Sequence, residues 1–166
     1  MTAARQQRKS LLGCGAALAV AVFTAFFASP ALPAAPADPV VTNALTGLAI
    51  SGFDPVAYFT DAKPKVGRPK LELRLDGAVW RFTNEGNRAA FADHPEVYMP
   101  RFGGYDPTAI ARGASVPGHP LIWAINGERL YLFYSTAARA AFLAEPAATI
   151  ERATRKWPQV MRTIAR

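Results

Sequence analysis

Two stretches of the chain repeat the same order of apolar runs and turn residues. In each stretch, two short, mainly apolar runs flank a turn dipeptide: residues 71–75 and 78–82 flank Asp76-Gly77, and residues 121–125 and 129–133 flank Asn126-Gly127. Asp-Gly and Asn-Gly readily adopt the positive φ angles that a two-residue hairpin turn requires. The pattern therefore predicts two β-hairpins.

A helix is expected after each hairpin. Asn84 and Ser135 stand where an N-cap would accept hydrogen bonds from the first turn, and each precedes an Arg-Ala-Ala-Phe segment, ending at Phe91 or Phe142, and then a proline that should stop the helix. A hairpin–helix unit cannot bury its own apolar face, so the two copies are expected to share one small antiparallel sheet with the helices on one side. The predicted fold class is α+β, completed by a C-terminal helix.

A second repetition links GFDPVAY, residues 52–58, to GYDPTAI, residues 104–110. Asp is a favoured N-cap and Pro is favoured at the first helical position, so Asp54 and Asp106 are each expected to cap a short helix. The alternative is a pair of acidic catalytic groups in a hydrolase. The N–H groups bound to a capping carboxylate hold it ionised, which makes it a poor general acid. Capping is the favoured interpretation, and no catalytic residue is assigned.

The first 35 residues have the layout of a signal peptide. Three basic residues, Arg5, Arg8 and Lys9, precede an apolar run over residues 11–28, and small residues follow. The run is long enough for an uncleaved membrane anchor to be an alternative. Residues 36–42 are rich in Pro and Ala and are expected to form a linker, before a single domain over residues 43–166. The domain is expected outside the cytoplasm, periplasmic or secreted, with membrane contact only through the N-terminal segment.

Composition excludes several kinds of chemistry. Cys14 is the only cysteine and lies in the predicted signal, so the mature domain has no thiolate for catalysis or metal binding. Without the three basic residues of the signal, 16 of the 19 in the chain remain, against 12 acidic residues. No run of Lys and Arg is interleaved with aromatic residues, so nucleic acid is not an expected partner. HExxH, phosphate-loop and dinucleotide motifs are missing too, so an enzyme is not expected.

The strongest candidate for a binding site is the segment 98–106. Its adjacent glycines permit backbone angles and close approaches that other residues resist. Either they let two layers of the protein pack, or they form a corner that receives a small anionic or hydroxylated ligand. The candidate ligand-binding residues are Asp54, Tyr58, Tyr98, Arg101, Gly103, Gly104, Tyr105, Asp106 and Trp123.

A metal site has weaker support. The candidate ligands are His94, His119 and Asp106, and none stands at a diagnostic spacing. The simpler interpretation is two solvated histidines and a helix cap. The cofactor, if any, is therefore unknown, and no Cys-ligated metal is expected.

Residues 150–164 predict an amphipathic helix. Its apolar stripe contains Ala153, Trp157 and Val160, and basic residues occupy the rest of the helical wheel. Burial of the stripe against the domain is favoured over contact with a membrane or a protein partner, which would make the protein an envelope interaction module. Pro158 is expected to break or kink the helix.

Taken together, these segments resemble the YHS-domain family over residues 43–160. The resemblance is carried, in order, by Gly52 to Phe59, Trp80-Arg81-Phe82, Phe91, Pro95 to Tyr98, Phe102 to Tyr105, and Gly127 to Leu132. It implies little about function, because exported members are mostly described only as YHS-domain proteins. The small size, the missing catalytic motifs and the aromatic-lined turn favour a non-catalytic accessory module of the cell envelope that binds a small ligand or a metal. In many exported relatives a cysteine follows Gly-Gly-Tyr, and shorter members use cysteines linked to metal binding. Asp106 stands at that position here, so thiolate capture of a metal does not carry over.

Overall fold

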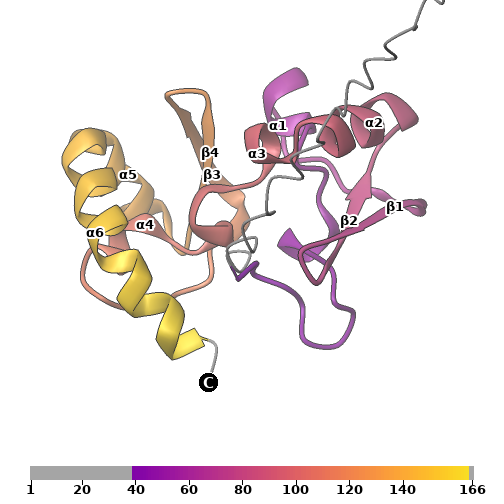
Figure 1. Cartoon of the computed structure of the whole chain (residues 1–166). Coiled ribbons are helices and arrows are strands. Elements are labelled where there is room, and N and C mark those ends of the chain that lie inside the picture. Colours follow the sequence, from indigo (N-terminus) through magenta and orange to yellow (C-terminus); the bar gives the residue numbers. More distant parts are fainter. Residues whose placement is uncertain (1–38, 165–166) are drawn as a thin grey trace, which may run out of the picture. The chain divides into compact units, whose positions relative to one another are not determined.

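The computed structural model describes residues 39–164, within a compact unit of the chain, Ala35–Arg166. The predicted signal and residues 36–38 of the predicted linker lie outside the described residues. The helices and strands confirm the α+β class (Figure 1). In chain order they are η1 (Ile50–Gly52), α1 (Ala57–Thr60), β1 (Arg68–Leu75), β2 (Ala78–Phe82), α2 (Glu85–Asp93), α3 (Pro95–Tyr98), η2 (Arg101–Gly104), α4 (Pro107–Ile110), β3 (His119–Asn126), β4 (Arg129–Phe133), α5 (Thr136–Ala144) and α6 (Pro146–Ile164).

Both predicted hairpins are confirmed, but the expected single sheet is wrong. β1 pairs antiparallel with β2, β3 pairs antiparallel with β4, and each pair forms a separate two-stranded sheet. The outer edge of β2 is taken by a local segment instead. The Val79 N–H donates to the Gly47 carbonyl at 3.0 Å, and the Ala49 N–H donates to the Val79 carbonyl at 2.9 Å. This edge is therefore not free to pair with the second hairpin.

The turn of the second hairpin lies one residue later than predicted. Asn126 pairs with Arg129, and the two residues with positive φ are Gly127, at 54°, and Glu128, at 58°. In the first hairpin the corresponding residues are Asp76, at 51°, and Gly77, at 74°. The cross-strand register sets the loop here, and it holds Glu128 in the left-handed region that side-chain-bearing residues usually avoid.

The structure repeats itself internally. We call residues 50–98 the first repeat and residues 102–149 the second repeat. The Gly67 N–H donates to the Gly52 carbonyl at 2.9 Å, and the Gly118 N–H donates to the Gly104 carbonyl at 2.9 Å. Both hairpins also carry an irregularity at the same place, after Arg68 in β1 and after His119 in β3. Equivalent positions are 52 residues apart around the Asp-Pro segments and 51 apart from the strands onward.

Two glycines keep the strands close to the turn in front of them. A Cβ atom on Gly118 would lie 2.5 Å from Leu132 Cβ and 2.8 Å from the Gly104 carbonyl oxygen. A Cβ atom on the equivalent Gly67 would lie 2.5 Å from the Arg81 backbone. Backbone cannot move aside as a flexible side chain can, so glycine is required at both positions.

We predict that Gly118→Ala lowers the free energy of unfolding by about 3 kcal/mol, because the added methyl overpacks a rigid site. The matched control is Gly113→Ala. Gly113 has a φ of +85°, and a methyl group added there would meet no neighbouring atom within 4 Å, so only backbone strain of about 1 kcal/mol is expected. Urea denaturation followed by circular dichroism measures both. Equal losses in the two variants would contradict the close approach.

Helix caps and ends follow the sequence. The Asn84 side chain accepts from the Asn87 N–H at the start of α2, and the Ser135 side chain accepts from the Ala138 N–H at the start of α5. Both helices end before the prolines that are expected to stop them. These local predictions are confirmed, because capping needs only residues that are neighbours in the chain.

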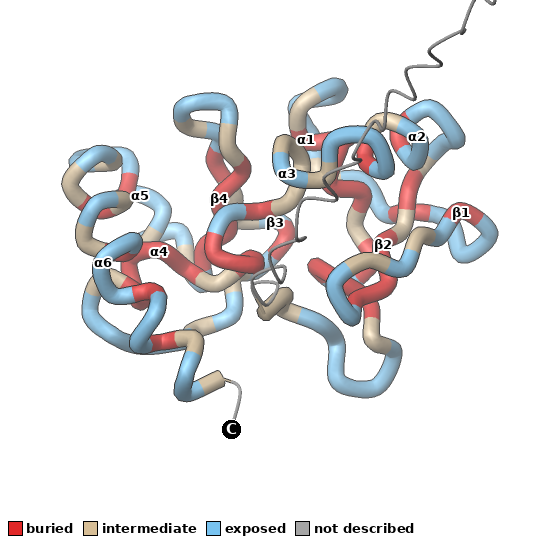
Figure 2. The backbone as a smooth tube through the Cα atoms, in the orientation of Figure 1, coloured by how far each residue is buried: buried red, intermediate tan, exposed pale blue. Residues whose placement is uncertain are grey.

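Strand β4 of the second hairpin is buried on both of its faces. Leu130 and Leu132 belong to a core cluster with Trp80, Phe82 and Phe91 of the first repeat. The neighbouring strand residues Tyr131 and Phe133 face a second cluster with Phe142 and Trp157. Buried positions accordingly run without alternation along most of β4 (Figure 2).

One cross-strand pair shows that the two hairpins differ in their exposure to solvent. In the first hairpin, Glu72 lies opposite Arg81 and accepts from its Nε at 2.8 Å, on a face open to solvent. In the second hairpin, the equivalent pair is Trp123 and Leu132. The charged pair of one repeat is therefore an apolar pair in the other, where the hairpin contacts the first repeat.

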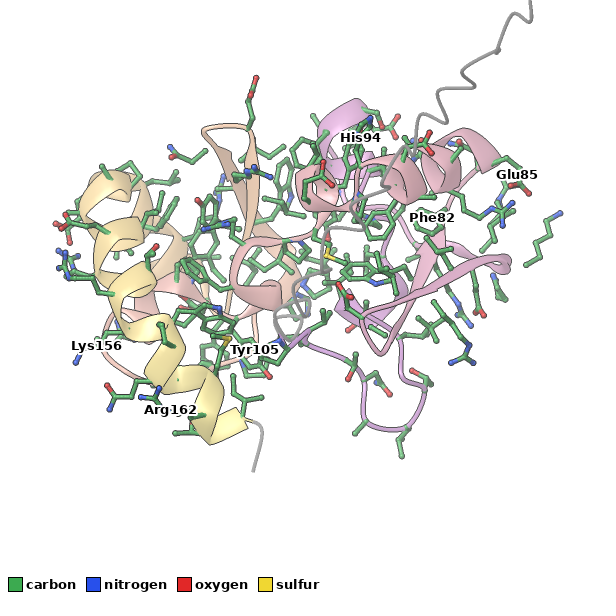
Figure 3. The ribbon with its side chains drawn as sticks, viewed as in Figure 1. Phe82, Glu85, His94, Tyr105, Lys156 and Arg162 are labelled. Carbon is green, nitrogen blue, oxygen red and sulfur yellow. The ribbon has the colours of Figure 1, made fainter. Side chains whose placement is uncertain are left out.

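The C-terminal helix α6 buries its apolar stripe, as predicted. Ala153, Trp157 and Val160 are buried, whereas Lys156 and Arg162 are exposed and point outward (Figure 3). Of the predicted break or kink at Pro158, the break is wrong, because α6 continues through it to Ile164, and the kink stays a prediction. Pro158 lies on the exposed side between two buried anchors, which hold the helix together across the missing backbone hydrogen bond. No helix within residues 39–164 is long and apolar enough to span a bilayer.

Candidate functional site

Asp54 is a buried structural carboxylate. Its Oδ1 accepts from the Val56 and Ala57 N–H groups at 2.9 and 3.3 Å, which caps the turn that leads into α1. Its Oδ2 accepts from the Thr83 N–H and hydroxyl, both at 2.8 Å, and from the Asn87 amide at 2.7 Å. The side chain is fully buried. Asp54 thus joins the start of α1 to the end of β2 and to α2.

Asp106 does the same in the second repeat. Its Oδ1 accepts from the Thr108 N–H at 2.7 Å and the Thr108 hydroxyl at 2.8 Å, which caps α4. Its Oδ2 accepts from the Tyr134 N–H at 3.0 Å, just beyond β4. The side chain is 1% exposed. The predicted helix cap is confirmed for Asp106, whereas Asp54 caps the turn just before α1. Each carboxylate adds a cross-link to its own hairpin.

Tyr58 and Trp123 meet at the contact between the repeats. Their rings are 5.3 Å apart in an edge-on arrangement, and the Tyr58 hydroxyl donates to the Pro120 carbonyl at 2.8 Å. Burial, together with the nearby charge of Asp54, raises the pKa of Tyr58 well above its usual range. The hydroxyl is therefore a fixed donor that ties α1 to β3, and it does not present itself to a ligand.

The other tyrosines of the candidate set lie in two different places. Tyr98 packs edge-on against Phe59 of α1, with ring centres 5.5 Å apart. Tyr105 lies 5.9 Å from the Trp157 ring of α6, and burial raises its pKa. These side chains support the two ends of the segment 98–106, but they do not converge.

The glycine pair has a packing role. A Cβ atom on Gly103 would lie 1.9 Å from the Pro39 carbonyl oxygen, and the Val41 N–H donates to the Gly103 carbonyl at 2.8 Å. Gly104 supplies the carbonyl that receives the Gly118 N–H. These direct contacts support close packing of the chain at this turn, rather than a corner that receives a ligand.

A cavity of ≈ 180 Å³ lies beside this turn. It opens between the end of the first hairpin and the segment that joins α3 to η2. Its lining includes Val40, Asp76, Trp80, Glu96, Met99 and Gly103. Of the residues expected in the ligand site, Arg101 and Gly103 line it, whereas Asp54, Asp106, Tyr58 and Trp123 are engaged elsewhere.

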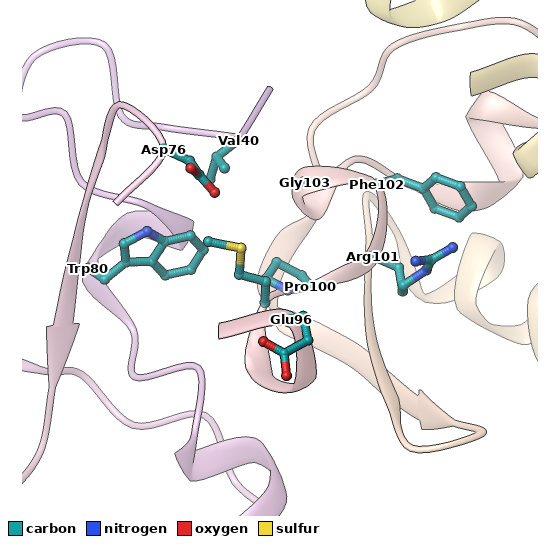
Figure 4. Close-up of a pocket in the computed structure, with 9 residues that line it drawn as sticks. Val40, Asp76, Trp80, Glu96, Pro100, Arg101, Phe102 and Gly103 are labelled. Carbon is teal, nitrogen blue, oxygen red and sulfur yellow. The ribbon is translucent and has the colours of Figure 1, made fainter. Parts of the chain in front are cut away.

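Arg101 contributes little charge to the middle of this cavity. Its guanidinium lies 5.4 Å from the centre of the Phe102 ring, and both side chains turn away from Trp80 (Figure 4). On that side, burial raises the pKa of Tyr131, and Arg101 opposes the rise. The carboxylates of Asp76 and Glu96 are the remaining charged groups of the lining. The cavity therefore offers hydrogen-bond acceptors beside apolar walls.

The candidate metal ligands are not brought together. His94 is exposed, and its Nδ1 lies 3.6 Å from Glu96 Oε1. His119 is exposed at the start of β3, and its Nδ1 accepts from the Leu121 N–H at 3.2 Å. Asp106 is buried with internal donors on both oxygens. Within residues 39–164, no group of three or more His, Cys, Asp or Glu side chains is placed to hold a metal.

The sequence pattern does not predict that acidic side chains line this cavity. The pattern assigns Asp76 to the hairpin turn, where it has a φ of 51°. Trp80 is fully buried, and its Nε1–H donates to the Leu75 carbonyl at 3.3 Å. Glu96 occupies an ordinary position in a short helix. Asp76 and Glu96 line the same cavity because the folded chain brings the first hairpin beside α3, and these two elements are distant in the sequence.

No protein-family model, curated protein or solved structure matches the chain. The resemblance to the YHS-domain family therefore stays a prediction that rests on the residues quoted for it.

Proposed function

We propose that this protein is an exported, non-catalytic binding module of the cell envelope, of the YHS-domain kind, and that it holds a small hydroxylated ligand in the cavity beside η2. The supporting observation is the lining of that cavity. Asp76 and Glu96 can accept hydrogen bonds from ligand hydroxyls, and Val40, Trp80 and Met99 offer apolar surface to the carbon skeleton. The sequence suggests an anionic or a hydroxylated ligand, and two carboxylates favour the hydroxylated one.

The absence of a catalytic role is part of this proposal. Asp54 and Asp106, the acidic pair of the hydrolase alternative, have both carboxylate oxygens engaged by internal donors. A general acid or base must reach its substrate within hydrogen-bond distance. Neither side chain can do so without breaking its cap, so these residues favour a stable scaffold over a reacting pair.

The test is a titration of the mature protein with D-glucose, followed by two-dimensional NMR. We expect the indole N–H signal of Trp80 and the backbone signals of Met99 and Gly103 to shift with added sugar. The double variant Asp76→Asn and Glu96→Ala should weaken binding by about tenfold, because it removes both charged acceptors. Asn is chosen at position 76 because it tolerates the positive φ there.

Two controls keep this result specific. Glu85→Ala removes an exposed carboxylate of α2, paired with Arg88 and outside the cavity, and should leave the titration unchanged. Sodium acetate tests the anionic class with the same reporter signals. Shifts with acetate but not with glucose would reverse the choice of ligand class, and the absence of shifts with either would reject this cavity as the binding site.

A further inference from the structure

A second hollow lies in the second repeat, where α4, α5 and α6 meet. Its volume is ≈ 370 Å³, within the usual size range of small-molecule sites. The residues that matter are Thr108 and Ala111 from the α4 segment, Arg112 just after it, and Glu145, Thr149 and Arg152 from the end of α5 and the start of α6. None of them lines the cavity beside η2.

The internal repeat explains why this hollow exists. Ala111 is 52 positions after Phe59, and Thr149 is 51 positions after Tyr98, which are the offsets of the two repeats in these segments. In the first repeat, the Phe59 and Tyr98 rings pack against each other at 5.5 Å. The second repeat has a methyl group and a small hydroxyl side chain in their place. The hollow thus occupies the position that two aromatic rings fill in the first repeat.

The polar groups of the hollow have a positive excess. Arg152 Nη2 donates to Glu145 Oε1 at 2.7 Å and to Thr149 Oγ1 at 3.3 Å, so these charges neutralise each other and hold the side chains in place. Arg112 is exposed and makes no ion pair with any residue that the structure describes. Its guanidinium is free to bind a carboxylate in the two-pronged geometry that arginine favours.

We propose that this hollow binds a small planar organic anion, of which an aromatic carboxylate is the simplest kind. The ring takes the place of the missing aromatic pair between Ala111 and Thr149, and the carboxylate pairs with Arg112. Shape and charge support the same class of ligand, because the hollow replaces aromatic side chains and the free charge is positive. This site is separate from the cavity beside η2 and does not depend on the proposed function.

The experiment is a titration of the mature protein with sodium benzoate, followed by the backbone NMR signals of Ala111, Arg112 and Thr149. Benzylamine, which has the same ring and the opposite charge, is the ligand control. We expect benzoate to shift these signals and benzylamine to leave them in place. Arg112→Gln should weaken benzoate binding by about tenfold, since a hydrogen-bonded charge is lost. Arg155→Gln, on the exposed face of α6 outside the hollow, should leave binding unchanged.

The decisive variant transfers the side chains of the first repeat into the second. Ala111→Phe with Thr149→Tyr should fill the hollow and abolish the benzoate shifts while the fold is kept. If the double variant does not fold, Ala111→Phe alone tests the same point with less added volume. Unchanged benzoate binding in a folded filled variant would overturn the proposal, as would an equal response to benzoate and benzylamine. Failure of glucose to bind the cavity beside η2 would not contradict the proposal that the hollow binds benzoate.

Discussion

Asp54→Ala is expected to lower the free energy of unfolding by about 4 kcal/mol or more, because several buried donors lose their acceptor at once and each unsatisfied donor costs about 1–3 kcal/mol. These donors come from Val56, Ala57, Thr83 and Asn87. Asp106→Ala should cost less, about 2–3 kcal/mol, because its donors come only from Thr108 and Tyr134. Urea denaturation of the two variants gives this ranking directly.

Replacing each aspartate by asparagine distinguishes a side chain that only caps a turn or helix from one that also links that cap to the hairpin. For a simple N-cap, Asp→Asn leaves stability almost unchanged, which is what the sequence alone predicts for Asp106. In the structure both oxygens of each aspartate accept hydrogen bonds. An Asn side chain would turn an N–H₂ group toward N–H donors at one end. We therefore expect Asp54→Asn and Asp106→Asn each to lose about 1–3 kcal/mol. Variants as stable as the parent would restrict the aspartates to capping.

Local features of the fold could be predicted from the sequence. Hairpin strands, helix caps and helix stops depend on residues within a few positions of each other, and Asn84, Asp106 and Ser135 cap their helices as expected. Their signals are strong because turns and caps demand particular backbone angles or hydrogen-bond acceptors.

The arrangement of the hairpins could not be predicted in the same way. Whether β2 pairs with the second hairpin or with residues 47–49 depends on competition between distant segments, and residues 47–49 carry no strand pattern. The turn at Gly127 and Glu128 differs from the prediction for a related reason. Asn-Gly favours this turn strongly, but the cross-strand packing of β3 and β4 outweighs it here.

The cavity beside η2 was predictable only in part. Arg101 and Gly103 of the predicted segment line it, and adjacent glycines indicate a close backbone approach. The partner of that approach, Pro39, and the acidic side chains across the cavity come from elsewhere in the chain. The hollow of the second repeat could be predicted only from positions where the repeats differ, because Ala111 and Thr149 replace aromatic residues of the first repeat. The fold prediction instead depends on positions where the two repeats are similar.

The last prediction concerns the pair of strand residues in which the two hairpins differ most. Trp123→Glu with Leu132→Arg gives the second hairpin the charged pair of the first, and we expect this variant to be unfolded at room temperature. Leu132 is fully buried in the first core, and Trp123 packs edge-on against Tyr58. Breaking apolar packing of this size costs about 2–5 kcal/mol. Burying a charge without its full complement of partners costs about 3–5 kcal/mol more. The sum, about 5–10 kcal/mol, is comparable to the whole stability of a small domain, which is about 5–15 kcal/mol.

The reverse exchange is the matched control. Glu72 and Arg81 side chains are 37% and 25% exposed, and a surface ion pair contributes only about 0–1 kcal/mol. Glu72→Trp with Arg81→Leu should therefore change the free energy of unfolding by about 1 kcal/mol or less. Circular dichroism and urea denaturation compare the two exchanges. If the hairpin β3–β4 were open to solvent on one face, as β1–β2 is, both exchanges would be mild. A folded Trp123→Glu, Leu132→Arg variant with native-like stability would thus refute the placement of the second hairpin between two cores.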